Sequence, residues 1–205
     1  MASPTPTAGA LVSFQITTNG KPVDSTIQIV TIAVWAAFGT APRARVAVYD
    51  GTNQTFPISS GPAFAPGASI AIALGYEGTN TTVFEGTITA QKLEIGEPGN
   101  SLLLVEAVAK DIAVWSGSIP TPVLALTYGD SILALNATTL DGATAKSGGE
   151  VRFAGSALAV SGAAMTLDGL GDRFSGTALI TGVNHSVTEG QWTTTATYGA
   201  PPPAN

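Results

Sequence analysis

The sequence offers few side chains that could perform chemistry. It has no cysteine and one histidine among 205 residues, which excludes disulfides, thiol nucleophiles and cysteine-ligated zinc together. His185 has no second histidine to complete a metal site or a catalytic relay, and we interpret it as a structural residue with a local hydrogen bond. Ser156 does not lie in the Gly-x-Ser-x-Gly frame of a nucleophile elbow. The sequence therefore predicts no enzyme, no metal and no cofactor.

Aspartates and tryptophans are the remaining candidates for a binding site. Asp130, Asp168 and Asp172 stand beside glycines, but they lack the alternating oxygen ligands of a calcium loop and favour turns. The three tryptophans are far apart in the sequence, which favours packing in a core or an interface over a shared ligand platform. They are Trp35, Trp115 and Trp192.

The composition indicates a folded chain that is poor in charge. Hydrophobic residues make up 44% and charged residues 11%, with 24 glycines, 13 prolines and a net charge of −6. This hydrophobic content excludes a disordered chain, and the absence of a basic stripe argues against nucleic-acid binding. We expect no signal peptide at the N-terminus, and the apolar stretch 27–38 is too short to span a bilayer. The low charge predicts a surface that is largely covered by partners.

Short runs of alternating apolar and polar residues predict an all-β protein. The predicted strands cover 11–17, 27–38, 44–49, 69–76, 82–95, 101–109, 123–128, 131–135, 150–153, 163–167, 174–185 and 191–198. Asn19-Gly20 and Asp50-Gly51 are hairpin signals. The segment 109–116 is compatible with one short helix, and the small-residue segment 136–149 is expected to be a loop.

A Ser-, Gly- and Pro-rich break predicts two lobes. We expect a first β-barrel at 1–116, a linker at 117–122, a second β-barrel at 123–199 and a flexible tail at 200–205. Both halves show the same order of a glycine turn, a strand, Phe-x-Gly-Thr, a long strand, a Glu/Gly turn and a last strand. The Phe-x-Gly-Thr motifs are Phe84–Thr87 and Phe174–Thr177. The order indicates an internal repeat of one small barrel. Within the strands, Gly75, Gly86 and Gly176 predict bulges or close backbone approaches.

Several motifs, taken in order, resemble one family. They run Pro42-Arg-Ala-Arg-Val-Ala-Val-Tyr-Asp50-Gly51, Phe64-Ala-Pro66-Gly67, Gly75-Tyr76, Phe84-Glu-Gly86, Gly129-Asp130, Gly171-Asp172-Arg173-Phe174-Ser-Gly176 and Gly190-Gln-Trp192. This order resembles the hub portion of Vgr-type spike proteins of contractile injection systems and the related late-control hub proteins of phage tails. The chain departs from that family in two ways: only the short segment 136–149 stands where members carry an insertion, and no needle follows.

The resemblance implies a baseplate hub subunit that acts as a structural protein without its own spike. It implies a homotrimer between a hexameric tail tube and a separate spike, beside other baseplate components, in a particle assembled in the cytoplasm. Three chains with two barrels each would form a pseudo-sixfold ring. We expect its inner wall to be acidic, since three chains carry about −18. The alternative is an acidic β-sandwich that binds carbohydrate or a cell surface through exposed aromatic residues.

Overall fold

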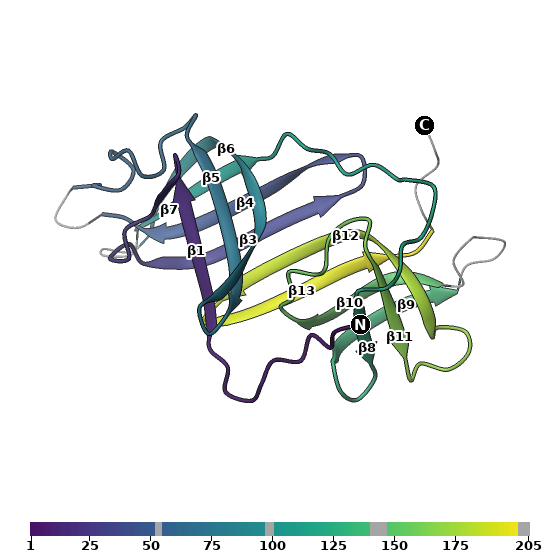
Figure 1. Cartoon of the computed structure of the whole chain (residues 1–205). Helices are drawn as coiled ribbons and strands as arrows, with labels where there is room; N and C mark the ends of the chain where they lie inside the picture. Colours follow the sequence, from purple (N-terminus) through teal and green to yellow (C-terminus); the bar gives the residue numbers. More distant parts are fainter. Residues whose placement is uncertain (52–54, 97–100, 140–146, 201–205) are drawn as a thin grey trace.

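The computed structural model describes residues 1–51, 55–96, 101–139 and 147–200. Its regular elements in these ranges are all β-strands (Figure 1), which confirms the all-β prediction. They are β1 (Val12–Thr18), β2 (Lys21–Pro22), β3 (Ile29–Ala37), β4 (Thr40–Tyr49), β5 (Ser69–Tyr76), β6 (Thr79–Ile95), β7 (Ser101–Val108), β8 (Leu124–Thr127), β9 (Ile132–Thr139), β10 (Ser147–Ala154), β11 (Ala164–Asp168), β12 (Gly176–Thr188) and β13 (Gln191–Tyr198).

One long sheet connects the two halves of the chain. Its strand order is β6-β7-β4-β3-β12-β13-β10-β9, with every neighbouring pair antiparallel. The two longest strands also take part in a second layer: the first part of β6 pairs with β5 and continues to β1, and the first part of β12 pairs with β11 and continues to β8. Figure 1 shows β1 and β5 crossing the strands of the long sheet.

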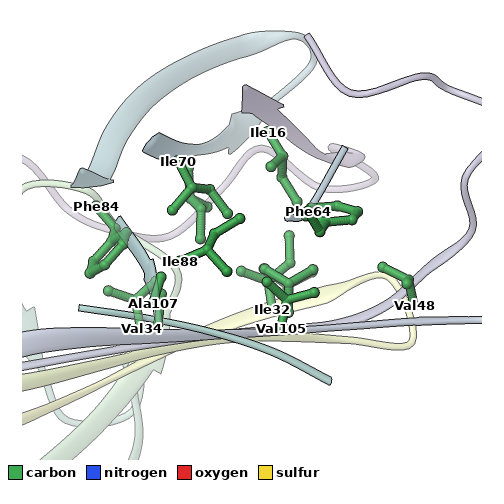
Figure 2. Packing of buried hydrophobic residues seen from close by; sticks show 14 of the residues in the cluster. Ile16, Ile32, Val34, Val48, Phe64, Ile70, Phe84, Ile88, Val105 and Ala107 are labelled. Atoms are coloured by element: carbon green, nitrogen blue, oxygen red, sulfur yellow. The ribbon is translucent and has the colours of Figure 1, made fainter. Parts of the chain in front are cut away.

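The hydrophobic residues form two clusters between the long sheet and the second layer. In the first cluster, Ile32 and Val105 project from the long sheet toward Ile16 and Ile70 of the second layer, with Phe64 beside them (Figure 2). The second cluster contains residues of β8, β10, β11, β12 and β13. Burial of apolar side chains on one side only is the reason that the strands alternate in sequence. The other side of the long sheet has no overlying strand among the described residues, and we call it the open face.

The structure corrects the predicted helix at 109–116, because the segment is irregular. The Ala113 carbonyl accepts a hydrogen bond from the Gly39 amide at 3.0 Å, and Trp115 packs edge-on against Phe38. These contacts hold the segment against the β3–β4 turn. Among the described residues no helix is long and apolar enough to cross a membrane.

Two further corrections concern turns. The Asp50-Gly51 pair does not close a hairpin: the buried Asp50 carboxylate accepts hydrogen bonds from the amides of Ile58 and Ser59, at 3.0 and 2.7 Å, and so shapes the long β4–β5 connection. The expected loop at 136–149 is wrong at both ends, because β9 extends to Thr139 and β10 begins at Ser147. The rest of that loop, the turn at 97–100 and the tail from 201 lie outside the described residues.

The two halves of the chain are in direct contact and are not joined only by the predicted linker. Strands β3 and β12 pair over seven positions, and two residues of the second half, Val187 and Trp192, lie in the first cluster. The division of the chain at 117–122 into two barrels stays a prediction.

Replacing Phe64 with alanine should strongly destabilise the fold. Its ring is fully buried in the first cluster, and emptying such a site typically costs about 3–5 kcal/mol. The matched control is Phe14→Ala on β1, whose side chain is 42% exposed, and it should cost about 1 kcal/mol or less. Chemical denaturation of both variants measures the difference, and equal losses would contradict the placement of Phe64.

Candidate functional site: paired and unpaired strand edges

His185 is a structural residue of the second half. Its ring is 2% exposed, and its Nδ1 shares a 2.9 Å hydrogen bond with the Thr194 hydroxyl. The indole of Trp192 lies beside the ring, with centroids 5.9 Å apart. Burial lowers the pKa of His185 from 6.5 to about 4, against the opposing effect of a hydrogen bond to the Ala159 backbone. The imidazole is therefore neutral near pH 7.

The other candidates for chemistry do not converge. No group of three or more metal-ligating side chains occurs in the part of the chain that the structure describes. Asp168 is in the β8–β11 region, where its carbonyl accepts a hydrogen bond from the Tyr128 amide at 3.0 Å. Of the tryptophans, Trp192 is buried against Tyr76 with ring centroids 5.4 Å apart. Trp35 lies elsewhere, on the open face, and is 40% exposed.

The residues of the resemblance motifs lie in two regions of the structure. Those of the first half and Trp192 lie in or beside the first cluster: Pro42, Asp50, Gly51, Phe64, Pro66, Gly67, Gly75, Tyr76, Phe84, Gly86 and Trp192. A Cβ on Gly75 would meet the Thr79 carbonyl oxygen, and one on Gly86 would lie 2.6 Å from the Val108 oxygen. Both are thus close backbone approaches, as expected. The same expectation is wrong for Gly176, where an added Cβ would meet nothing within 4 Å and the strand pairing shows no bulge. The others lie at the β8–β9 and β11–β12 connections: Gly129, Asp130, Gly171, Asp172, Phe174 and Gly176.

The two halves repeat one strand connectivity. The order β1-β5-β6-β7-β4-β3 of the first half corresponds to β8-β11-β12-β13-β10-β9 of the second. One pairing differs, because β1 is antiparallel to β5 whereas β8 is parallel to β11.

Two β-bulges mark equivalent residues in the repeats. The pairing of β6 with β7 skips a residue between Ile88 and Ala90, and that of β12 with β13 skips one between Ile180 and Gly182. The pairing of β3 with β4 skips one after Ile29, and that of β9 with β10 skips one after Ile132. Bulges are specific local features, so their recurrence fixes the alignment of the repeats.

Hydrogen bonds at the first bulge repeat as well. The Ile88 carbonyl accepts from the Gly67 amide at 2.8 Å, and the Ile180 carbonyl accepts from the Gly162 amide at 2.8 Å. Both glycines have positive φ, +89° and +97°, a conformation that glycine adopts without strain.

This alignment corrects the Phe-x-Gly-Thr comparison. Ile70 pairs with Gly86 in the first half, and its equivalent Met165 pairs with Ala178 in the second. The structural equivalent of Gly86 is therefore Ala178. The sequence motif equates Gly86 with Gly176 instead, which is an error of two residues.

The β3–β12 pairing buries apolar residues from both strands. His185 lies opposite Val34, and Val187 lies opposite Ile32. All four residues are at most 6% exposed. The pairing leaves little of either strand's core-facing side in contact with solvent.

The equivalents of these strands have a partner on one side only, as far as the structure describes the chain. When the repeats are aligned at their bulges, Leu93 and Ile95 of β6 correspond to the buried residues His185 and Val187 of β12. Leu93 and Ile95 are nevertheless 39% and 67% exposed. The second part of β6 pairs only with β7, and β9 pairs only with β10, among the described residues. The core-facing residues of β9, which correspond to the buried Ile32 and Val34, are only partly buried: Leu135 and Ala137. The chain thus presents two unpaired edges that repeat the two sides of its own internal pairing.

Sequence reasoning predicted the strands but not these edges. The alternation in Leu93 and Ile95 indicates a buried face, and only the pairing order shows that no described strand covers it. A signal was present in the second half, where the equivalent residues follow the same Ile-Thr-small bulge sequence, Ile180-Thr-Gly182 beside Ile88-Thr-Ala90.

Comparison with protein families gives a direct assignment. The model described as the Alg8 N-terminal domain matches residues 8–119 and 134–189. The chain belongs to the Alg8 N-terminal domain family. No curated protein matches the chain.

Solved structures share the fold of this family member. A prophage MuSo2 43 kDa tail protein from Shewanella oneidensis has a TM-score of 0.68 at 8% identity, with 93% of this chain and 98% of that chain covered. A tail protein from Neisseria meningitidis MC58 has a TM-score of 0.63 at 8% identity, with 91% and 96% covered. An E. coli component of the type VI secretion system, described as structurally similar to T4 tail proteins gp27 and gp5, has a TM-score of 0.59 at 11% identity, with 93% and 77% covered. The fold of phage tail proteins is therefore the fold of this chain.

His185 should make the fold sensitive to mild acid. Because its pKa is about 4 in the folded protein and 6.5 as a free group, the unfolded state binds the proton more tightly. Its contribution is fully present above pH 6.5 and is lost as the pH falls to 4, by about 3 kcal/mol. Denaturation at several pH values should show this slope in the native protein and its loss in His185→Gln, while carboxylate effects remain in both. An unchanged slope in the variant would contradict the assignment.

Proposed function

We propose that this chain is the baseplate hub subunit of a contractile injection system or phage-like tail, and that three copies close into a ring through the unpaired edges of β6 and β9. The observation that carries the proposal is the match between these edges and the internal β3–β12 pairing. An unpaired strand edge bearing apolar residues is a template for another strand.

The internal pairing supplies the register of the contact between copies. When the β3–β12 register is applied to the equivalent residues of β9 and β6, Leu93 lies opposite Ala137 of the next copy and Ile95 opposite Leu135 of the next copy. Apolar residues then meet apolar residues on the core-facing side. Each new contact would extend the long sheet without a break.

The β6 edge of each copy would pair with the β9 edge of the next copy. A contact between two different surfaces of this kind can close into a ring. Three copies give six similar units, which suits a protein between a hexameric tube and a trimeric spike. Eight strands of the long sheet per chain, at about 4.8 Å each, give a circumference of roughly 115 Å and a channel about 37 Å across before strand tilt is included. The second layer thickens one side of the sheet and fits the longer outer circumference, so the open face lines the channel.

This orientation revises the expected acidic channel wall. The open face carries four basic and three acidic side chains: Arg43, Arg45, Lys92, Arg152, Glu94, Glu106 and Glu150. Arg45 and Glu106 form an ion pair at 2.7 Å, and Lys92 and Glu94 form another at 2.6 Å. The wall would be nearly neutral, and the negative charge of the chain lies mainly outside it.

The fold shared with phage tail proteins and with the type VI secretion component supports a structural role in a tail-like assembly. The ordered motifs support the narrower assignment to Vgr-type and late-control hubs. A tube protein, a spike protein and other baseplate components are the partners that this role requires.

Charge on the β6 edge should prevent assembly. The double variant Leu93→Asp, Ile95→Asp places two carboxylates where the next copy's β9 would pair, and both sites are solvent-exposed in the single chain. We expect folded monomers, in contrast to trimers of the native chain, by light scattering after gel filtration. Phe14→Asp is the matched control, an exposed apolar residue on β1 of the second layer, and should remain trimeric.

A native chain that stays monomeric at high concentration and with its tube partner would contradict the ring. A double variant that still forms trimers would show that the copies associate through another surface.

A further inference from the structure

The open face contains a groove that the assembly role does not use. It lies across β4, β3, β12, β13 and β10, where both halves of the chain meet, and has a volume of about 570 Å³. This is within the range of small-molecule sites. Small residues, among them Ala37, Ala41 and Gly182, line it together with Trp35.

Strand register aligns the side chains of the groove. Trp35 lies opposite Arg43 on one side and Asn184 on the other, and Asn184 lies opposite Thr195. Glu150 stands one row further, opposite Thr197. An aromatic face is therefore flanked by polar groups on both sides along the sheet.

Several of these polar groups have no partner. The Asn184 Oδ1 has no hydrogen-bond partner among the described residues, but it is inaccessible to solvent and so does not face a ligand in the groove. Neither the Arg43 guanidinium nor the Glu150 carboxylate forms a hydrogen bond or an ion pair with the residues that the structure describes.

We propose that this groove binds a neutral saccharide. A sugar ring offers an apolar C–H face, which suits an exposed indole, and hydroxyls that both donate and accept. Arg43 supplies donors, and Glu150 supplies acceptors, since both side chains are exposed. Because Arg43 and Glu150 carry opposite charges, the groove does not select a ligand of one sign.

The same features disfavour a peptide strand as the ligand. The groove lies on a sheet face, where the backbone groups of β3, β12 and β13 are used in the ladder, so a peptide could not gain main-chain hydrogen bonds as it does at a sheet edge. Saccharide binding goes beyond the hub assignment and does not depend on it. In the proposed ring the grooves would face the channel.

The test is titration of the full chain with the methyl glycosides of glucose, galactose, mannose and N-acetylglucosamine, followed by calorimetry and tryptophan fluorescence. Fluorescence is measured in a Trp115→Phe background, because Trp115 lies outside the groove. We expect at least one glycoside to shift the emission of Trp35. Glu150→Gln and Arg43→Met should each weaken binding about tenfold, the value of one lost hydrogen bond of about 1.4 kcal/mol. Trp35→Ala should abolish it.

Tyr128→Ala is the control, an exposed aromatic away from the groove, and should bind as the native chain does. Circular dichroism checks that all variants fold. No response to any glycoside up to its solubility limit would overturn the proposal. So would binding that persists in Trp35→Ala, or a groove that binds a proline-rich peptide and no glycoside.

Discussion

The pairing of β3 with β12 is the contact on which the rest of the structure depends. It joins the two repeats edge to edge, so the sheets of both halves become one sheet with a single open face. It also covers apolar residues that would otherwise face water, as the exposed equivalents Leu93 and Ile95 show. A repeated strand unit that pairs with its copy through one edge leaves the equivalent edges at the two ends of the sheet. Intramolecular pairing and proposed assembly are thus one interaction used at successive junctions.

The repeats also differ in the residues that they place at this joint. The internal junction contains His185, hydrogen-bonded to Thr194, where the first repeat has the apolar pair Leu93 and Leu103. Trp35 on the open face corresponds to Thr138 of β9. A ring of three chains would therefore alternate two kinds of junction around its channel, with one kind of groove at each internal joint. Such a wall has threefold symmetry even where the backbone is pseudo-sixfold.

Much of the fold was predictable, because alternating apolar and polar residues indicate a strand with one buried face. The bounds of β5 and β13 match the sequence prediction, since both strands alternate cleanly and end at glycine turns. The prediction failed where tertiary contacts decide the conformation. Asp50 folds the β4–β5 connection through amides eight and nine residues away, and Trp115 holds 109–116 irregular by packing on Phe38. The candidate edges could not be predicted, because exposure of Ile95 depends on the order of strands and not on its neighbours in sequence.

The most direct test of the ring uses the absence of cysteine from the chain. Leu93→Cys combined with Ala137→Cys places two thiols opposite each other across the proposed junction, at the Cα separation of about 4.5–5.5 Å that suits a disulfide. Within one chain these positions are at opposite edges of the eight-stranded sheet, roughly 34 Å apart, so they cannot join internally. Mild oxidation should give a covalent trimer on a non-reducing gel. Leu93→Cys with Asn136→Cys, on the other face of β9, should give none. Uncrosslinked chains from an assembled particle, or equal crosslinking by both pairs, would contradict the account.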